Sequence, residues 1–416
     1  MELKDGYRQT EIGIIPNDWD IKPFHQVSFM KGRIGWQGLK QTEFTFNQNE
    51  PFLITGMNFK DGEIEWEEVY HVSEERYEIA KEIQLKPNDV LMTKDGTIGK
   101  LLFVNNIPFP YKATLNSHLL VFRPIRDSYV PKYLYYQLDF KYFKNHIELA
   151  KSGTTFYGIS QESVGKFQLP LPPLPEQQAI AEVLSDTDNL IQSLEKQIAK
   201  KRLIKQGAMQ QLLTPKEGWE VKKLPKVCWF QEGPGLRNWQ FTKSGMKVIN
   251  VTNLVNGYLD LDRTDRHITM DEFNKMYKHF EIDENDIVMA SSGNSYSKVS
   301  VVRKQDLPLL MNTSVIRFKP IGSLDYNYLL VFLKSKLFKD QIDLLITGGA
   351  QPNFGPAHLK LIDFPIPSSK QEQINIASII TSMDDEIELL EKKKEKYQLL
   401  KHGLMQNLLT GKIRLV

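Results

Sequence analysis

The residues that could do catalytic chemistry in this chain are scattered, and none falls into a recognisable catalytic motif. The stretch GTIGK from Gly96 is too short for a phosphate-binding P-loop, which needs four residues between its glycines. The stretch GRIGWQG from Gly32 does not follow the dinucleotide-binding pattern GxGxxG. The eight histidines lack the spacing of zinc ligands, and no HExxH occurs. We therefore expect no catalytic residue and no metal site.

Signatures of DNA-modifying enzymes are missing as well. An adenine methyltransferase needs a [DN]PP[YF] motif, whereas the only adjacent prolines, Pro172 and Pro173, stand before a predicted helix. Combinations of Asp, Glu and Lys can imitate a nuclease site by chance. An enzyme that carries its own nuclease or methyltransferase site is thus a rival hypothesis, which methylation assays on the isolated chain would distinguish.

Glycine-rich polar loops are better candidates for binding chemistry. Glycine lets the backbone approach a phosphate, while Ser, Thr, Asn, Gln and Arg bond to phosphates and base edges. Such loops stand at matching places in the two halves of the chain. They pair MKGRIGWQGLK from Met30 with QEGPGLRNWQ from Gln231, TKDGTIGK from Thr93 with SSGNSYSK from Ser291, and KSGTTFYGIS from Lys151 with TGGAQPNFGP from Thr347.

These loops supply the predicted DNA contacts, although plain surface turns would have a similar composition. Their residues differ between the halves while the surrounding stretches match, as expected if two copies of one fold read different DNA sequences. Neutral drift of loops gives the same pattern. The candidate contacts are Lys31, Arg33, Trp36, Lys40, Lys94, Thr97, Lys100, Lys151, Ser152, Thr154, Thr155 and Tyr157 in the first half, and Arg237, Asn238, Ser291, Ser292, Asn294, Ser295, Lys298, Thr347, Gln351 and Asn353 in the second.

An internal duplication must position these loops. Glu176–Thr214 matches Glu372–Thr410 without a gap, and both segments close on LLT. Further upstream, ITGMNFKDGEI from Ile54 pairs with INVTNLVNGYL from Ile249, and LNSHLLVFRPI from Leu115 pairs with MNTSVIRFKPI from Met311. The period is far too long for a solenoid. The chain therefore consists of two copies of one unit, each a globular part followed by a helix.

Each predicted helix carries one apolar stripe with steps of three and four residues, as in a coiled coil. A stripe packed only on its own domain is the alternative, but a helix of this length cannot bury its whole stripe on one small domain. We expect the two helices to pair and to bind partner subunits. The stripe residues are Ile180, Leu184, Ile191, Leu194 and Ile198 in the first helix, and Ile376, Ile380, Met383, Ile387 and Leu390 in the second.

The charges on the two helices favour an antiparallel pair. The first helix begins with acidic residues such as Glu182 and Asp186 and ends with basic ones such as Lys201 and Lys205. The second repeats this order, so a parallel pair would bring like charges together. The same order also suits the helix dipole, which is a purely local explanation.

Composition agrees with a folded protein that reads DNA by specific contacts. The chain has 416 residues, of which 41% are hydrophobic and 25% charged, and no run of about 18 apolar residues that would predict a membrane span. A net charge of +2 excludes a generic polycation. One cysteine, Cys228, and a polar N-terminus without a signal peptide predict a cytoplasmic protein.

The predicted fold class is α+β. Short strands such as Lys100–Val104 and His118–Pro124 and helical patterns from Tyr129 and Asp325 indicate two mixed α/β domains. They are separated by two long helices that form an antiparallel coiled coil, in an internal tandem duplication with a pseudo-two-fold arrangement.

Three stretches resemble a known family. They are YRQTEIGIIPNDWDIKPF at the start, LPLPPLPEQQAIAEVLSDTDNLI before and within the first helix, and the repeated QQLLT and QNLLT closures. Together they are similar to the specificity (S) subunit of type I restriction–modification enzymes, over essentially the full length. The second linker, FPIPSSKQEQ, departs from the PLPPLPEQQ pattern of the family.

The resemblance implies two target-recognition domains, residues 1–169 and 215–364, each of which reads one half of a split site in double-stranded DNA. Residues 170–214 and 365–416 would hold the proline linkers and the spacer helices, which in the family also dock methyltransferase (M) subunits, commonly two. Restriction (R) subunits then join. S-adenosylmethionine, ATP and magnesium belong to those partners, and this chain would hold no cofactor. A DNA-binding coiled-coil scaffold or regulator without a modification partner is the alternative.

Helix length limits the split site. A helix of about 38 residues spans roughly 57 Å at ~1.5 Å per residue, the length of about 17 base pairs of B-DNA. Half-sites read from one face of DNA should lie about one turn apart, ~10 base pairs from centre to centre. The predicted target is therefore bipartite and, because the loops differ, asymmetric. The partner methyltransferase would flip an adenine out of the duplex.

Overall fold

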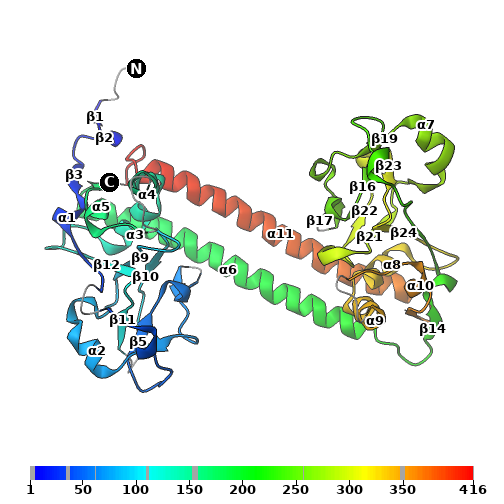
Figure 1. Ribbon diagram of the computed structural model, residues 1–416, viewed down its shortest axis with the longest axis horizontal. Coiled ribbons are helices and arrows are strands. Elements are labelled where there is room, and N and C mark those ends of the chain that lie inside the picture. Colours follow the sequence, from blue (N-terminus) through cyan, green and yellow to red (C-terminus); the bar gives the residue numbers. More distant parts are fainter. Residues whose placement is uncertain are drawn as a thin grey trace. The chain divides into compact units, whose positions relative to one another are not determined.

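A computed structural model of the chain describes residues 5–33, 38–60, 62–108, 112–151, 158–255, 257–346 and 352–415. The chain divides into two compact units. Unit 1 comprises Met1–Leu194 and Lys393–Val416, and unit 2 comprises Glu195–Lys392. Each unit therefore contains one globular part together with segments of both long helices (Figure 1).

Two small sheets form the centre of unit 1. One has the order β10-β9-β12-β4 with antiparallel neighbours, and the other has the order β11-β5-β8 with a parallel β11–β5 pair. Along β9, Val90 and Met92 enter one core cluster while Leu91 enters another, which is the two-residue alternation of a strand covered on both faces. The strands are β4 (Ser28–Lys31), β5 (Phe52–Ile54), β8 (Tyr70–His71), β9 (Val90–Thr93), β10 (Leu101–Phe103), β11 (Ala113–Leu115) and β12 (Leu119–Pro124).

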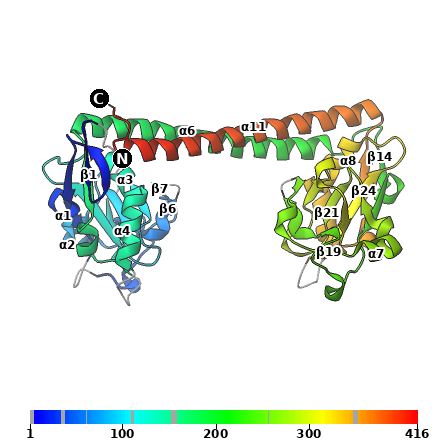
Figure 2. The same ribbon diagram turned by 90° about the horizontal axis from the view of Figure 1, so that it is seen from above.

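Helices and short ribbons complete unit 1. The helical pattern expected from Tyr129 is divided at Phe140 into α3 (Pro131–Asp139) and α4 (Lys141–Lys151), because Phe140 turns into the core. Figure 2 shows both helices beside the sheet. The other elements are β1 (Tyr7–Thr10), β2 (Gly13–Pro16), β3 (Asp20–Pro23), α1 (Phe24–Val27), β6 (Phe59–Lys60), β7 (Glu63–Ile64), α2 (Glu74–Ile79), α5 (Gln161–Gly165) and β13 (Gln168–Leu171).

Unit 2 repeats this plan and confirms the predicted duplication. Its sheet β15-β24-β21-β22 has the connectivity of β4-β12-β9-β10, and its second sheet, β19-β16-β23-β20, again holds one parallel pair. These strands are β15 (Cys228–Glu232), β16 (Met246–Ile249), β19 (His267–Ile268), β20 (Glu281–Ile282), β21 (Ile287–Ala290), β22 (Val299–Val301), β23 (Leu309–Met311) and β24 (Val315–Pro320). The remaining elements are β14 (Glu220–Lys223), β17 (Leu254–Val255), β18 (Tyr258–Leu259), α7 (Met270–Glu272), α8 (Tyr326–Leu333), α9 (Lys336–Leu345), α10 (Pro356–Leu359) and β25 (Asp363–Ile366).

The long helices α6 (Leu174–Leu212) and α11 (Lys370–Leu408) each contribute to both units. In unit 1 the start of α6 packs against the end of α11, since Leu184 and Leu408 share one core cluster with Trp19. In unit 2 the start of α11 packs against the end of α6, with Ile380 and Met209 in one cluster. Within each unit the two helices therefore run in opposite directions.

Ion pairs between the helices have the polarity that the sequence predicted. In unit 2, Lys201 Nζ lies 2.7 Å from a carboxylate oxygen of Glu386, and Lys205 pairs with Asp384. In unit 1, Lys401 Nζ lies 2.6 Å from Asp188. The basic end of one helix thus meets the acidic start of the other, and the antiparallel prediction is confirmed in both units.

The predicted pairing of the helices through the apolar stripe is confirmed, whereas the same residues are not available to bind a partner subunit. The stripe residues are buried within the chain, because the helices use the stripe to pack on each other and on the globular part of their unit. Ile180, Leu184, Ile191, Leu194, Ile198, Ile376, Ile380 and Ile387 are at most 8% exposed, and Met383 and Leu390 are half-buried. The exposed apolar residues of the helices lie elsewhere, at Leu174, Leu203, Ile204, Ile374, Ile379, Leu389, Leu399 and Leu400.

Segments at the two ends of the sequence meet in unit 1. Tyr7 donates from its hydroxyl to the carbonyl oxygen of Gly411 at 2.9 Å. Arg414 donates to Glu176 at 2.6 and 2.7 Å and to Asp18 at 2.7 and 2.9 Å. Glu176 is 1% exposed and also accepts from the indole of Trp19 at 3.1 Å. The hydrogen bond from Arg414 lowers the pKa of Asp18. Arg414 thus neutralises a buried carboxylate.

No helix among the described residues is long and apolar enough to cross a membrane.

Replacing Arg414 by alanine should destabilise unit 1. The change leaves the Glu176 carboxylate buried without its cation, and removal of one partner of a buried pair costs about 3 kcal/mol. Urea unfolding of the full chain measures the loss. The control Lys412→Ala alters an exposed residue of the same segment and should stay within about 0.5 kcal/mol of wild type. Equal stabilities for the two variants would contradict this role of Arg414.

Candidate nucleic-acid interface

Three loops of unit 1 come together beside the four-stranded sheet. The loop after β9 is joined to the segment after α4, because Ile159 donates its backbone N–H to Lys94 O at 2.7 Å and Asp95 forms an antiparallel bridge with Gly158. Gln161 donates to Met30 O at 2.7 Å and so ties the same segment to the end of β4, where the first loop begins. The structure therefore brings together the three loop regions that the sequence singled out in the first half.

The loop after β9 is internally braced. The hydroxyl of Thr93 donates to Thr97 O and accepts from Lys100 N at 2.9 Å. Gly96 and Gly99 have φ of 65° and 83°, a conformation in which a side chain would be strained. The glycines thus allow a tight turn whose shape is set before any ligand arrives.

The corresponding loops of unit 2 converge in the same way. Gly293 donates to Pro352 O at 3.0 Å, Phe354 donates to Ser291 O at 3.0 Å, and Ser292 bridges Asn353. The first loop reaches the group through Glu232, whose carboxylate lies near Gly355. Gly233 continues the pairing with β24 by donating to Val315 O at 3.0 Å. Burial raises the pKa of Glu232.

The predicted contact residues differ in exposure. Lys40, Thr97, Lys100, Arg237, Asn238, Asn294, Lys298 and Asn353 are exposed, and Lys31, Lys94, Lys151, Ser292 and Ser295 are half-buried. Trp36, Ser152, Thr154, Thr155, Tyr157, Thr347 and Gln351 lie outside the described residues. Several cations already have partners within the chain. Lys31 pairs with Glu82 at 2.9 Å, Lys151 pairs with Glu148 at 2.7 Å, and Lys100 donates to Phe59 O at 2.5 Å.

Two predicted contacts are wrong because their side chains are buried. Arg33 is 1% exposed and donates to Leu115 O at 2.9 Å and to the Thr114 hydroxyl at 3.1 Å. Burial, and secondarily the charge of Arg76, lower the pKa of Arg33 to about 10. Ser291 is also 1% exposed, since its backbone pairs with neighbouring segments on both sides. Both residues are structural and cannot touch DNA in this conformation.

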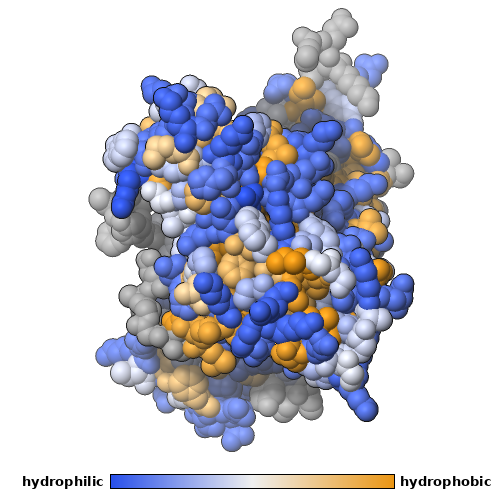
Figure 3. Space-filling model, turned by 90° about the vertical axis from the view of Figure 1, so that its right-hand side faces the viewer, coloured by the Kyte–Doolittle hydropathy of each residue, from blue (hydrophilic) through white to orange (hydrophobic). Residues whose placement is uncertain are grey.

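Exposed apolar residues near the loops were missed by the sequence reasoning. Trp239 is 81% exposed and directly follows Arg237 and Asn238, which are exposed as well. Met57 is 82% exposed in a turn beside the loop after β9. Figure 3 shows that apolar residues interrupt the polar surface on the side that it displays. In the sequence, the polar neighbours Arg237 and Asn238 could have indicated that Trp239 is exposed. No comparable feature of the sequence indicated that Met57 is exposed.

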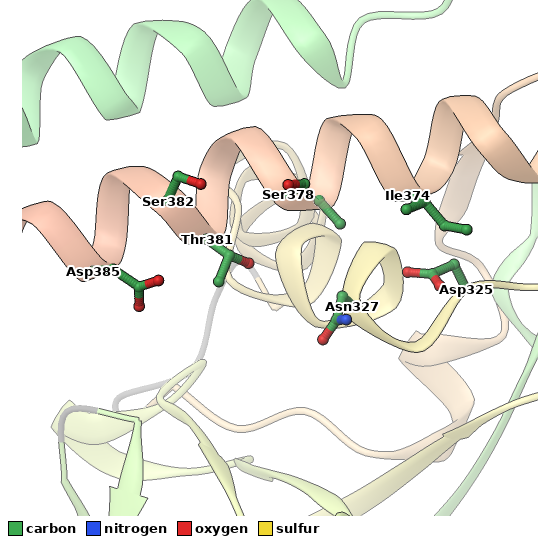
Figure 4. Close-up of a pocket in the computed structure, with 8 residues that line it drawn as sticks. Asp325, Asn327, Ile374, Ser378, Thr381, Ser382 and Asp385 are labelled. Carbon is green, nitrogen blue, oxygen red and sulfur yellow. The ribbon is translucent and has the colours of Figure 1, made fainter.

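A pocket of unit 2 lies on α11, and none of the residues that line it belongs to these loops. It encloses about 320 Å³ between the start of α8 and the first turns of α11. In Figure 4, Asp325 and Asn327 come from the α8 side, while the hydroxyl residues Ser378, Thr381 and Ser382 come from α11. Most of the residues that line the pocket are polar, with Ile374 and Ala377 as the apolar ones. Among the described residues, no group of three His, Cys, Asp or Glu side chains is arranged to hold a metal ion.

Comparison with known proteins identifies the family. The family model for the type I restriction modification DNA specificity domain matches residues 28–201 and again residues 216–398. This chain belongs to that family. The two matches coincide with the two repeats, so the specificity subunit carries two recognition domains and is α+β.

Curated relatives agree with this family. The chain is 30% identical to the type I restriction enzyme MjaVIII specificity subunit of Methanocaldococcus jannaschii, over 80% of this chain and 81% of the relative. It is 27% identical to a putative type I restriction enzyme MjaX specificity subunit of the same organism, over 99% and 97% of the two chains. These relatives support a DNA-specificity subunit and not a coiled-coil regulator without a modification partner.

Solved structures show the same fold. A type I restriction–modification S subunit from M. genitalium covers 98% of both chains with a TM-score of 0.58 at 16% identity. A chain from a structure described as the basis of complex assembly and conformational transition of the type I R-M system covers 96% of this chain and 99% of its own length, with a TM-score of 0.59 at 13% identity.

Substitutions of Arg33 and Lys40 should have different effects, the first on protein stability and the second on DNA binding. Arg33→Ala leaves buried acceptors unsatisfied and should cost about 2–4 kcal/mol of unfolding free energy. Lys40→Ala should change stability by less than about 0.5 kcal/mol, but should weaken DNA binding and reduce the salt slope by about 1. Urea unfolding and salt-dependent DNA binding by the assembled enzyme measure the two effects. Normal stability of Arg33→Ala with lost DNA binding would contradict the assignment.

Proposed function

We propose that this specificity subunit selects one bipartite DNA sequence, with unit 1 reading one half and unit 2 the other. The observation that carries the proposal is the repeated joining of the loop after β9 or β21 to the segment after α4 or α9. The same backbone frame is present in both units, because Lys94 O accepts from Ile159 as Ser291 O accepts from Phe354. Yet Lys94 and Asp95 stand where the other unit has Ser291 and Ser292. Because the loop backbones of the two units match while their side chains differ, the two half-sites are expected to differ in sequence.

The exposed loop residues suit both parts of DNA recognition. Lys40, Lys298 and Arg237 offer charge to phosphates, while Asn294 and Asn353 can bond to base edges. The net charge of the chain is only +2, so general attraction to the phosphate backbone contributes little to DNA affinity. Tight binding then requires correct contacts between the loop side chains and the bases.

The long helices would set the gap between the half-sites. Helix α6 is continuous over 39 residues, about 58 Å at 1.5 Å per residue, which limits the separation to roughly 17 base pairs. Half-sites about one turn apart, ~10 base pairs, meet this limit. Pairing with α11 stiffens the spacer within each unit.

The chemistry would belong to partner subunits. We expect two methyltransferase subunits, which bind S-adenosylmethionine and flip the target adenine, and restriction subunits that use ATP and magnesium. This chain would choose the target without catalysis, in the cytoplasm where host DNA lies. Since the stripe is buried, the outward residues of the helices are the proposed docking surface for the methyltransferase. They are Leu203, Ile204, Leu389, Leu399 and Leu400.

Methylation sequencing of host DNA that carries the intact system tests the proposal. We expect one motif with two different half-sites and a fixed gap. Insertion of one helical turn into α6 near Lys196, with a matching turn in the paired part of α11, adds about 5.4 Å and should lengthen the gap by one or two base pairs.

Both half-sites should be retained in the insertion variant. A length-neutral control, Glu195→Ala with Gln197→Ala, should leave the whole motif unchanged. A changed half-site after the insertion would refute the division of labour between loops and helices.

A further inference from the structure

One short turn of unit 1 presents an apolar side chain to solvent. The 3-10 turn η3 (Gly56–Asn58) follows β5 and carries Met57 at its centre. The Met57 side chain is 82% exposed, the highest value among the large apolar residues that the structure describes. Exposure of a single methionine is ordinary by itself, so the case for binding rests on how this turn is held and on what lies beside it.

Hydrogen bonds fix the direction of this side chain. The Thr55 hydroxyl accepts from Met57 N at 3.2 Å, and the Asn58 side-chain oxygen accepts from Thr55 N at 2.9 Å. The Asn58 amide also donates to Glu68 O at 3.1 Å. Thr55 and Asn58, which brace the turn, are 7% and 5% exposed, whereas Met57 between them is exposed. Met57 is therefore held outward by a braced backbone.

The turn lies against the loop after β9, which belongs to the candidate interface. A Cβ placed on Gly56 would lie 3.0 Å from the Thr93 methyl group. Lys100 donates from its ammonium to Phe59 O at 2.5 Å and to Gly56 O at 3.5 Å. Hence a positive charge is held at the base of the turn, and a DNA strand attracted to that charge would pass close to Met57.

Unit 2 contains the same frame with a different tip. In η7 (Val251–Asn253) the Asn250 side chain accepts from Thr252 N at 2.8 Å, and Asn253 accepts from Asn250 N at 3.0 Å. Asn253 donates to Asp260 O at 2.9 Å, as Asn58 does to Glu68. The central Thr252 is exposed, and η7 packs against η11 (Gly293–Ser295) of the neighbouring loop.

Met57 and Thr252 occupy the same position in turns of the same backbone structure, but one side chain is apolar and the other is polar. A methionine thioether donates no hydrogen bond and accepts only weakly, so its favourable partner on a base edge is the thymine C5-methyl group in the major groove. A threonine hydroxyl both donates and accepts, and it bonds to a base edge or a phosphate.

We propose that Met57 and Thr252 are matched specificity-determining residues, and that Met57 contacts the methyl group of one thymine in the half-site read by unit 1. This inference rests on the proposed function and assigns base-reading positions within it. Both residues lie outside the loops that sequence reasoning singled out.

Duplex binding by the assembled methyltransferase tests the proposal, once methylation sequencing has given the motif. Each thymine of the motif is replaced in turn by deoxyuridine, which removes only the methyl group. With wild type, one thymine of one half-site should show a roughly three- to tenfold loss of affinity. With Met57→Ser, affinity for the normal duplex should fall by a similar factor, and that deoxyuridine should cause no further loss.

Two companion variants complete the experiment. Thr252→Met should change the preference at one position of the other half-site only. Ile14→Ser, at a half-exposed apolar residue of β2 in the same unit, should leave binding and motif unchanged. Because Met57 and Thr252 are exposed, unfolding curves of all variants should match wild type.

The possible failures can be distinguished. If wild type methylates no bipartite motif, the proposed function fails and this inference with it. If a bipartite motif is present, two results overturn the inference alone. One is wild-type binding that no single deoxyuridine replacement in either half-site weakens. The other is a Met57→Ser variant that keeps wild-type affinity or still responds to every deoxyuridine as wild type does.

Discussion

Antiparallel contact between α6 and α11 is the constraint on which both units depend. Neither globular part closes its core with residues from its own half of the sequence alone. In unit 1, Met405 and Leu408 fill the core beside Trp19, and the buried Gln137 amide donates to Leu409 O at 3.1 Å. In unit 2 the end of α6 has the same role. Because this packing buries the stripe, only the outward residues of the helices are available to partner subunits. The backbone that carries the loops is held in place by contacts between residues far apart in the sequence.

A fixed frame explains how loops of ordinary composition can read DNA. Among the described residues, backbone hydrogen bonds join the loop after β9 to the segment after α4, and the same holds in unit 2. Side chains at the loop surface are therefore free to change without loss of the fold. Asp95 and Ser292 illustrate such a change within one chain, and Met57 and Thr252 illustrate it on the neighbouring turns. Base specificity can then diverge between the units while their architecture remains the same.

Patterns that repeat along the sequence predicted the fold well. They did not predict which individual polar residues are buried. The duplication, the α+β class and the antiparallel helices follow from matched segments, apolar spacing and charge order, each a property of many residues. Arg33 sits among glycines and lysines and resembles a phosphate ligand, yet three-dimensional packing places its guanidinium on Leu115 O and Thr114. The stripe and the pairing of the helices through it were predicted correctly. That the globular parts cover the same stripe, and leave none of it to a partner subunit, is seen only in the structure. Met57 was missed because an exposed methionine has no sequence signature.

Cysteine cross-linking measures the direction of the helices most directly. Lys205 pairs with Asp384 in unit 2, and Asp384 and Lys401 are roughly 25 Å apart along α11 at 1.5 Å per residue. A short bismaleimide should therefore join Lys205→Cys to Asp384→Cys and leave Lys205→Cys with Lys401→Cys unlinked. Cys228 should not interfere, because it is 1% exposed and burial raises the pKa of its thiol to about 12. Parallel helices in register would bring the matched positions 205 and 401 together, so linkage of the second pair and not the first would contradict the account.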